Sequence, residues 1–562
     1  MSSLVRLSRC GVLTRCRSAS LISPRLYHED GNSVSKDLGG SKKNEKDDEK
    51  HIVPPDSKKE QKRVEEAVRK DKNTTTVETV RPNYFGYLSG VVTTLWNPTA
   101  HLLEAGHELL TGTTQPAAKP KEKVAKVVVK KASRAEIVSR TRQLIKKLQL
   151  AESTSSKLMR TEELNRHLMD YPASRSVLVQ ENPEMISRLL RQVSTTSDVS
   201  LRGESRICLA LCGYHAPPKA SGIRILSIDG GGTRGLIGLE ILGELERILG
   251  GRITDHFDLI SGVSTGAIIS VMLAARRMKV REVKETYMEI SRRLFSQTRL
   301  SGVSGLLLSH SYYNTKKWME ILKSVLGEEQ SVIDTAREEN AVKLVILSCL
   351  VNAQQLQPYV FRNYEHPSGR DSHFRGGTKH KLWQAIQASA AAPGYFEEVS
   401  LGTTLHQDGG VLANNPTAIA LHEARLLWPH ERVQCVVSVG NGRSVNELEL
   451  TSTITNTGIQ DKITKIVDSA TDTELVHMSM TDLLEPRCYF RLNAYMSQHY
   501  TLDEVSPERL IAMNQDARAY VRRNRLKIRG AALQLSKPAP LLSTMKRAVQ
   551  NMKNRNGMYK AE

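Results

Sequence analysis

A serine between two glycines is the first candidate for catalysis. Ser264 is flanked by Gly262 and Gly266, and this run stands between an apolar strand candidate at residues 257–260 and an apolar helix candidate at residues 267–275. A serine on a sharp strand-to-helix turn needs small neighbours, because bulky side chains would keep the strand and the helix apart. The amino terminus of the following helix favours negative charge that develops at the serine. The pattern therefore predicts a nucleophilic serine of acyl-transfer chemistry.

Residues 229–235 form a glycine-rich run that also follows a strand candidate and opens a helix candidate at Gly235. Such a loop can hold the phosphates of a dinucleotide, hold a phosphate in an actin-like sugar kinase, or supply backbone N–H groups as an oxyanion hole. No Gly-Lys-Ser/Thr sequence follows, which excludes a Walker phosphate loop. The serine turn downstream needs an oxyanion hole, and a kinase has no use for that turn. We therefore expect the hole to be formed by Gly230, Gly231 and Gly232.

An acyl-transfer serine also needs a base, and Asp408 is the first candidate. The glycines that follow it, Gly409 and Gly410, would let the backbone approach closely and bring the carboxylate to Ser264. An unperturbed aspartate pKa near 3.9 makes a poor base, so burial and a hydrogen bond from the serine would have to compensate. The alternative is a Ser-Asp-His triad. Its candidate bases, none of them in a distinctive glycine or turn context, are His422, His430, His477 and His499. His406 is the nearest rival to Asp408 and is expected to point to the opposite face from its strand neighbours.

The order of the predicted elements indicates an α/β core behind these loops. Strand candidates occur at residues 223–228, 257–260, 342–347, 359–361, 433–439 and 488–492. Helical spacing resumes between them, and strands that alternate with helices predict a sheet with helices on both faces. The uncharged stretch 259–275 is interpreted as a buried strand, turn and helix rather than a membrane-spanning helix, because two glycines and a serine interrupt it.

Residues 133–215 instead show helical spacing throughout. Ser133 and Glu136 fit a capping box, and short amphipathic helices are predicted around residues 158–170, 184–193 and 199–213. Successive short helices indicate a helical module, either of the armadillo or HEAT-repeat kind or a plain helical bundle. Cys208 and Cys212 lie four residues apart on the last of these helices and are expected to be buried core thiols.

Taken together, the three glycine-containing motifs resemble the signatures of patatin-like phospholipases. The loop 229–235, the serine turn 262–266 and Asp408-Gly409-Gly410 occur in that order, and residues 391–396 resemble the family's loop before the aspartate. The resemblance covers about residues 223–425. It implies a three-layer α/β/α core with a largely parallel central sheet, completed by a C-terminal extension at 426–562. It also implies a Ser264–Asp408 dyad without histidine, an oxyanion hole at Gly230–Gly232, and attack on the sn-1 or sn-2 esters of glycerophospholipids.

The amino-terminal region has the composition of a targeting leader followed by a linker. Residues 1–28 contain five arginines and no acidic residue, which is typical of a mitochondrial transit peptide. Residues 29–132 are expected to be a disordered, charged linker, with 12 basic and 13 acidic residues at 29–80. An apolar patch at 83–110 fits an interfacial anchor or a docking helix. The sequence ends Lys560-Ala561-Glu562 and not in a peroxisomal Ser-Lys-Leu tripeptide, so import by that signal is not expected.

Composition and charge narrow the classes of function. The 562 residues include 80 Lys and Arg against 60 Asp and Glu, a net charge of +20, and 39% hydrophobic residues allow a real core. The seven cysteines include no Cys-x-x-Cys pair, which excludes a zinc ribbon, and neither a metal site nor a cofactor is expected. The acid-free stretch 518–560 favours an anionic lipid such as cardiolipin over nucleic acid.

The resulting expectation is a calcium-independent, mitochondrial and membrane-associated phospholipase that releases a fatty acid and a lysophospholipid through an acyl-enzyme. A neutral-lipid lipase or a lysophospholipase is the alternative among enzymes. A catalytically inactive membrane-bound adaptor is the alternative of another class, against which the intact Ser264 and Asp408 argue. The protein partner of the helical module stays open.

Overall fold

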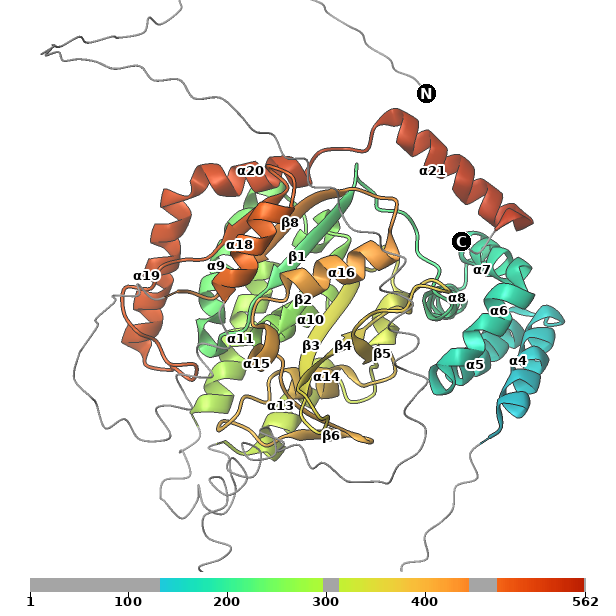
Figure 1. Ribbon diagram of the computed structural model, residues 1–562, viewed down its shortest axis with the longest axis horizontal. Helices are drawn as coiled ribbons and strands as arrows, with labels where there is room; N and C mark the ends of the chain where they lie inside the picture. Colours follow the sequence, from blue (N-terminus) through green and yellow to red (C-terminus); the bar gives the residue numbers. More distant parts are fainter. Residues whose placement is uncertain (1–131, 297–312, 444–472, 560–562) are drawn as a thin grey trace, which may run out of the picture. The chain divides into compact units, whose positions relative to one another are not determined.

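The computed structural model describes residues 132–296, 313–443 and 473–559 (Figure 1). The leader, the linker and the apolar patch predicted for residues 1–131 lie outside these ranges. Within them, a central sheet carries helices on both faces, and a separate group of helices precedes it in the chain. The α/β class and the helical region before it are therefore as predicted.

The described residues contain one nine-stranded sheet with the order β5-β4-β3-β2-β1-β8-β9, extended by β7 beside β3 and by β6 beside β7. The pairs β3–β2, β2–β1, β1–β8 and β8–β9 are parallel, so the centre of the sheet is parallel, as predicted. Antiparallel pairing is confined to β3–β4, β3–β7 and β6–β7. The strands are β1 (Ile223–Ile228), β2 (Leu259–Val263), β3 (Lys343–Leu350), β4 (Gln357–Arg362), β5 (Arg375–Gly377), β6 (Val399–Leu401), β7 (Thr404–Asp408), β8 (Val433–Val439) and β9 (Tyr489–Leu492).

The sheet is covered on both faces because its central strands are apolar on both sides. All residues of β1 and β2 are buried, as expected for parallel strands between two helical layers. Along β1 the side chains alternate: Leu226 and Ile228 join one hydrophobic cluster, and Ile223 and Ile225 join another. The first cluster includes residues of α9 (Gly235–Leu249), α10 (Thr265–Ala274), α11 (Val280–Phe295), α13 (Thr315–Leu326), α14 (Leu382–Ser389), α19 (Pro507–Arg523) and α20 (Arg525–Leu535). The second includes residues of α16 (Thr417–Leu427) and α18 (Thr473–Leu483).

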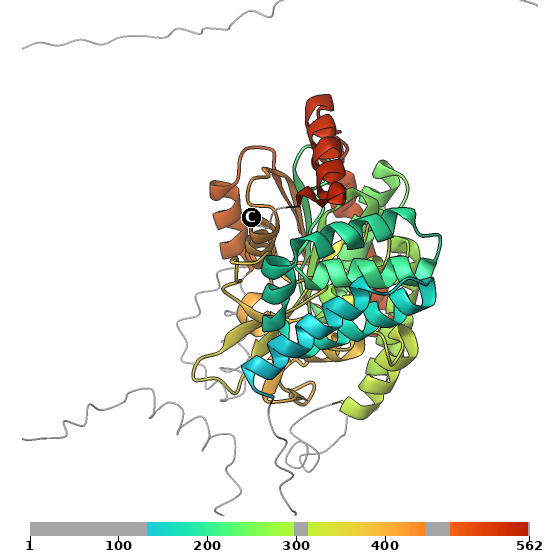
Figure 2. The same cartoon turned by 90° about the vertical axis from the view of Figure 1, so that its right-hand side faces the viewer.

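The helical module forms a separate hydrophobic cluster, which Ile333 and Ala336 of the short helix η4 (Ile333–Arg337) also join. Its helices are α4 (Arg134–Gln149), α5 (Thr154–Asp170), α6 (Arg175–Glu181), α7 (Pro183–Thr195) and α8 (Val199–Leu211), and Figure 2 shows them grouped together. The predicted capping box is present: the Ser133 N–H donates to Glu136 Oε2 at 2.7 Å, and the Glu136 N–H donates to Ser133 Oγ at 3.2 Å. Cys208 and Cys212 are buried, as predicted.

The carboxyl-terminal segment ends in an amphipathic helix, α21 (Leu541–Lys553), followed by the short helical segment η5 (Asn554–Met558). Arg547 of α21 donates hydrogen bonds to the carbonyl oxygens of Pro218 and Ala220, just before β1. η5 packs against α7, and the Tyr559 ring lies edge-on to the Tyr214 ring, with centroids 5.8 Å apart.

In the part of the chain that the structure describes, no helix combines the length and the hydropathy needed to cross a bilayer. The uncharged stretch 259–275 consists of β2, the turn at Ser264 and α10, so its interpretation as strand, turn and helix is confirmed.

Candidate active site

Ser264 occupies the turn between β2 and α10 with φ 53° and ψ −122°. This backbone conformation is sparsely populated for a residue with a side chain and typically costs about 1–3 kcal/mol. The flanking glycines make the turn possible. A Cβ atom at Gly262 would collide with the carbonyl oxygen of Gly266, and one at Gly266 would collide with the carbonyl oxygen of Ile228. The turn thus presents the serine side chain at the carboxyl end of β2.

The structure brings Asp408 to this serine. Ser264 Oγ donates to Asp408 Oδ2 at 2.6 Å, although 144 residues separate the two in sequence. Asp408 is the last residue of β7, which runs antiparallel to β3 beside β2. The N–H of Gly410 donates to the other carboxylate oxygen at 2.7 Å. A Cβ atom at Gly409 would lie 2.5 Å from the carbonyl oxygen of Leu347, so close approach requires glycine here.

Asp408 lies where a carboxylate is poorly solvated. Its exposed fraction is 6%, and burial raises its pKa to about 6, although the hydrogen bonds from Ser264 and Gly410 act to lower it. The sequence argument required burial and a hydrogen bond from the serine to make this aspartate a competent base. Both are present.

A second serine holds the turn in place. The N–H of Ser264 donates to Ser389 Oγ at 2.9 Å, and the Ser389 hydroxyl donates to the Leu347 carbonyl at 2.6 Å. The N–H of Ser264 is therefore engaged and does not face a substrate carbonyl. Ser389 is a buried residue at the end of α14, and nothing in its local sequence pointed to this contact.

The glycine loop lies directly against the serine, since a Cβ atom at Gly230 would lie 3.2 Å from the Cβ atom of Ser264. The Gly230 N–H donates weakly, at 3.3 Å, to the Asn414 carbonyl. The Gly231 carbonyl accepts from Arg234 N and Nε at 3.2 and 3.1 Å, which fixes the next peptide plane. Among the described residues, the N–H groups of Gly231 and Gly232 have no acceptor. Two amide donors beside a nucleophile are the arrangement that an oxyanion requires.

Residues 226–421, which span β1, the glycine loop, the serine turn and Asp408, match the model of the family described as "Patatin-like phospholipase". This segment is a patatin-like phospholipase domain. The chain is 41% identical over 406 residues to "Calcium-independent phospholipase A2-gamma" of Homo sapiens, covering 72% of this chain and 51% of the relative. It is 39% identical over 443 residues to the protein of that name from Mus musculus, covering 79% and 56%. The chain thus spans about half the length of these relatives.

A solved structure titled "Human GIVD cytosolic phospholipase A2" aligns with 69% of this chain and 65% of its own, with 11% sequence identity and a TM-score of 0.29. The family assignment depends on the match of residues 226–421 to the family model and not on this alignment.

Behind the glycine loop lies a buried ion pair between Asp229 of the patatin-like domain and Arg491, which follows that domain in the chain; sequence reasoning missed it. Arg491 Nη2 of β9 donates to Asp229 Oδ2 at 2.6 Å, and both side chains are 3% exposed. Burial raises the pKa of Asp229 to about 6, although the charge of Arg491 and its hydrogen bond act to lower it. Asn441 Nδ2 donates to the carbonyl oxygens of Asp229 and Gly230, at 2.6 and 3.2 Å. These contacts hold the start of the loop. The one feature of the sequence that could have indicated this ion pair was an arginine inside the apolar strand candidate 488–492.

The histidines considered for a triad lie elsewhere in the patatin-like domain or beyond it. His406 is buried, with Nδ1 2.9 Å from Ser348 Oγ and Nε2 2.8 Å from Thr404 Oγ1, and burial lowers its pKa to about 4. In the described ranges, neither Ser264 nor Asp408 makes a hydrogen bond with any histidine. The other four histidines, all away from the serine, are His422, His430, His477 and His499.

Proposed function

We propose that this chain is a phospholipid acyl hydrolase that uses Ser264 as nucleophile and Asp408 as base. One observation carries the proposal: the 2.6 Å hydrogen bond from Ser264 Oγ to a buried carboxylate, made on a strained strand-to-helix turn. The patatin-like domain and the relatives named as calcium-independent phospholipases favour a phospholipid ester as substrate. Attack at the sn-1 or sn-2 ester would release a free fatty acid and leave a lysophospholipid.

In the proposed mechanism Asp408 accepts the hydroxyl proton as Ser264 Oγ attacks the ester carbonyl. The N–H groups of Gly231 and Gly232 stabilise the oxyanion that forms. The tetrahedral intermediate collapses, the lysophospholipid alkoxide takes the proton from Asp408, and an acyl-serine remains. Asp408 then accepts a proton from water, which attacks the acyl-serine. As the fatty acid leaves, Ser264 Oγ takes that proton back from Asp408, and the free pair is restored. The relatives named as calcium-independent favour a reaction without calcium, so we expect calcium chelation to leave the rate unchanged.

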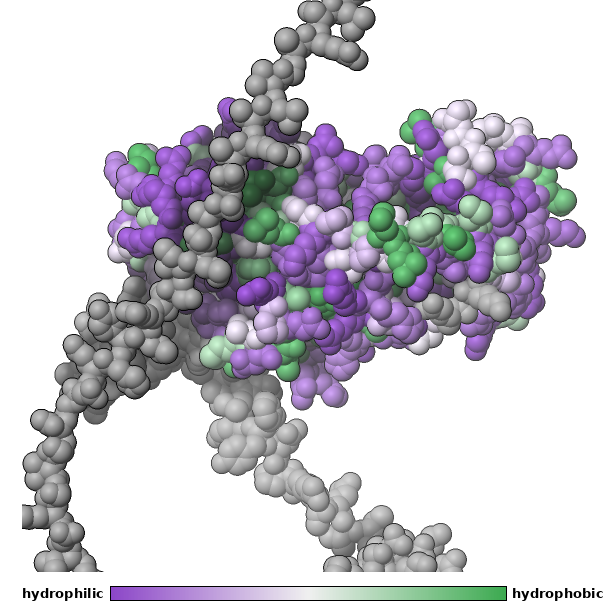
Figure 3. Space-filling model, turned by 90° about the horizontal axis from the view of Figure 1, so that it is seen from above, coloured by the Kyte–Doolittle hydropathy of each residue, from purple (hydrophilic) through white to green (hydrophobic). Residues whose placement is uncertain are grey.

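The membrane is the proposed partner, and α21 supports it. The helix carries four apolar side chains on one face, and each is at least half exposed: Leu541 84%, Met545 67%, Val549 51% and Met552 63%. Its opposite, polar face is the one that contacts the protein, through Arg547. Figure 3 looks onto the side of the molecule that carries α21 and shows hydrophobic residues among hydrophilic ones. An amphipathic helix with an outward apolar face and no acidic residue fits an anionic bilayer surface such as one containing cardiolipin.

The test of the proposed function compares the wild type with Ser264→Ala and Asp408→Asn on phosphatidylcholine vesicles, with fatty acid and lysolipid products quantified by mass spectrometry. Each variant is expected to lose at least about 10³-fold in rate, and the double variant no more than the worse single one, because the two groups act as a unit. Ser200→Ala and Asp482→Asn, at exposed positions on α8 and α18, are the matched controls.

Near-normal turnover by Asp408→Asn would place the base elsewhere and return the histidines to consideration. Triacylglycerol and lysophosphatidylcholine in the same assay separate the phospholipase from a neutral-lipid lipase and a lysophospholipase. An inactive wild type that still binds vesicles would instead favour the adaptor.

A further inference from the structure

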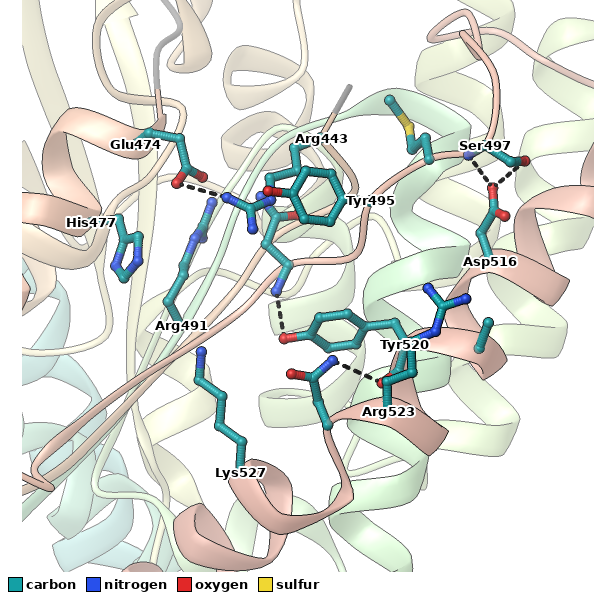
Figure 4. Close-up of a pocket in the computed structure, with 14 residues that line it drawn as sticks. Arg443, Glu474, His477, Arg491, Tyr495, Ser497, Asp516, Tyr520, Arg523 and Lys527 are labelled. Carbon is teal, nitrogen blue, oxygen red and sulfur yellow. Dashed lines mark hydrogen bonds and ion pairs between the residues drawn. The ribbon is translucent and has the colours of Figure 1, made fainter. Parts of the chain in front are cut away.

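A cavity lies at the carboxyl ends of β8 and β9, away from the catalytic pair (Figure 4). Its volume is about 450 Å³, within the range of small-molecule sites, and neither Ser264 nor Asp408 lines it. Its walls come from the residues that follow β8, from β9 and the loop after it, and from α18, α19 and α20. Ligands of open α/β sheets bind at this edge of the sheet.

Cationic side chains outnumber acidic ones in the lining of the cavity. Four of its side chains are arginine or lysine: Arg443, Arg491, Arg523 and Lys527. Arg443 pairs with Glu474 at 3.3 Å and Arg491 pairs with Asp229 at 2.6 Å. Arg523 and Lys527 have no ion-pair partner in the described ranges. Partial burial of its ammonium group lowers the pKa of Lys527, and the nearby Arg443 and Arg491 lower it further, whereas Glu474 raises it.

The acidic side chains in the walls offset only part of this charge, because two carboxylates stand against four cations. Glu474 is already paired with Arg443. Asp516 Oδ2 accepts from the N–H and hydroxyl of Ser497, both at 2.9 Å, and from the Tyr500 hydroxyl at 2.9 Å. An anion entering the cavity would therefore meet two uncommitted cations.

Two guanidinium groups in the wall also have an N–H donor that makes no hydrogen bond among the described residues. The Nε atoms of Arg443 and Arg491 are buried and have no acceptor in the described part of the chain. The Arg443 guanidinium lies over the Tyr495 ring, 3.9 Å from its centroid, so its plane is held before any ligand arrives. Preorganised arginine donors are suited to phosphate oxygens, which accept several hydrogen bonds at once.

We propose that this cavity is a phosphate-ester site, separate from the catalytic serine. Its ligand is a phosphate group esterified to a small polar alcohol, carried either by a lipid headgroup or by a soluble compound. Arg523 and Lys527 supply the uncompensated charge, and Arg443 supplies a fixed donor. Arg491 lines the cavity and also pairs with Asp229, which directly precedes the glycine loop. One side chain therefore contacts both the proposed ligand site and the segment that leads into the oxyanion donors.

The test is a binding measurement on the full chain carrying Ser264→Ala, so that no probe is hydrolysed and a failure of the proposed function does not affect it. The probes are glycerol 3-phosphate, dihexanoyl phosphatidic acid and, as a choline-capped comparison, dihexanoyl phosphatidylcholine, titrated calorimetrically at 150 mM salt. We expect at least one of the two exposed phosphate esters to bind, and R523Q/K527Q to weaken that binding at least about tenfold. R525Q/R529Q removes the same charge from α20 outside the cavity and should bind as the parent does.

Preferential binding of phosphatidic acid would identify a lipid headgroup as the source, and equal or tighter binding of glycerol 3-phosphate would identify a soluble one. Equal loss in the two double variants would reduce the effect to general surface charge and overturn the site. The absence of binding by every probe up to millimolar concentration would also overturn it. Melting curves of both variants confirm that the replaced side chains, exposed in the parent, leave the fold intact.

Discussion

At the scale of single residues, the protonation of Asp408 determines when the catalytic pair can work. Burial holds its pKa at about 6, so the carboxylate is mostly charged at pH 7 and is protonated below pH 6. Only the charged form can accept the serine proton. We expect kcat/KM on phosphatidylcholine to fall about tenfold per pH unit below about 6. A rate measured from pH 4.5 to 8 that stays flat down to pH 5 would contradict this assignment.

The same burial of Asp408 predicts an effect on the stability of the fold. Because the folded pKa is raised above the ordinary value of 3.8, the charged carboxylate destabilises the fold above pH 6, and this cost disappears as the pH falls toward 4. Asp408→Asn should therefore be more stable than the wild type at pH 7, by about 1–3 kcal/mol, and the difference should shrink at pH 4.5. Urea unfolding at the two pH values measures it. Equal stability at pH 7 would show that the carboxylate is adequately solvated.

The functional residues that could be identified from the sequence are those that stand in short local motifs. Ser264, Asp408 and their glycines stand in short motifs, and the structure places them within one site. The residues that support them could not be identified, because their partners are remote in sequence. Ser389 contacts a residue 125 positions away, Asn441 one at 212 positions and Arg491 one at 262 positions. A buried serine or asparagine has no pattern of its own until the fold brings its partner to it.

At the scale of elements, the glycine loop depends on a backbone shape that alanine cannot adopt without strain. Gly232 has φ 56°, and a Cβ atom there would collide with the carbonyl oxygen of Leu502. We expect Gly232→Ala to abolish hydrolysis and to cost about 1–3 kcal/mol of stability. Gly243→Ala on α9 is the control, since its Cβ would have its nearest neighbour at 3.8 Å and should be neutral or stabilising. Thermal melts and the phosphatidylcholine assay compare the two, and an active Gly232→Ala would remove this loop from the mechanism.

The apolar face of α21 leads to a prediction about adsorption. Replacing Leu541, Met545 and Val549 with serine removes apolar area that is exposed in the free protein, so folding should be unaffected. Co-sedimentation with cardiolipin-containing vesicles should weaken at least about tenfold.

The matched control for this triple variant removes three exposed apolar side chains from the helical module, Leu150, Met159 and Val199, again as serine. Equal vesicle binding by the two triple variants would mean that α21 does not bind the bilayer. α21 is held beside the residues that precede β1, whereas Ser264 follows the carboxyl end of β2. Hydrolysis of a soluble short-chain ester should therefore be spared in both variants.

Strands were predictable where they form continuous apolar runs. β1, β2, β3, β4, β8 and β9 all fall on predicted segments, with boundaries shifted by a few residues. β5, β6 and β7 were missed because they are only three to five residues long and include exposed or polar positions. In the sheet, β5 pairs with β4, β7 pairs with β3, and β6 pairs with β7, and no local period in the sequence encodes these pairings.

At the scale of the whole molecule, the leader proposed at residues 1–28 predicts where the chain is delivered. Fusion of residues 1–27 to a passenger protein should direct it into mitochondria, because such import depends on a basic, acid-free amphipathic segment. Replacing Arg6, Arg9, Arg15 and Arg17 with glutamate should block import. Imaging and fractionation of both fusions measure this, and unchanged mitochondrial location of the glutamate variant would refute the leader.

The contact between η5 and α7 has a consequence for biosynthesis. The ribosome synthesises α7 roughly 360 residues before it synthesises η5, which covers one surface of α7. At about 5–20 residues per second, this interval lasts on the order of 20–70 seconds. During that interval the helical module exists with one face uncovered, and Tyr214 has no Tyr559 ring beside it. The nascent chain therefore presents a transient binding surface for a chaperone. A ribosome stalled before residue 554 should keep that surface open, and release of the finished chain should close it.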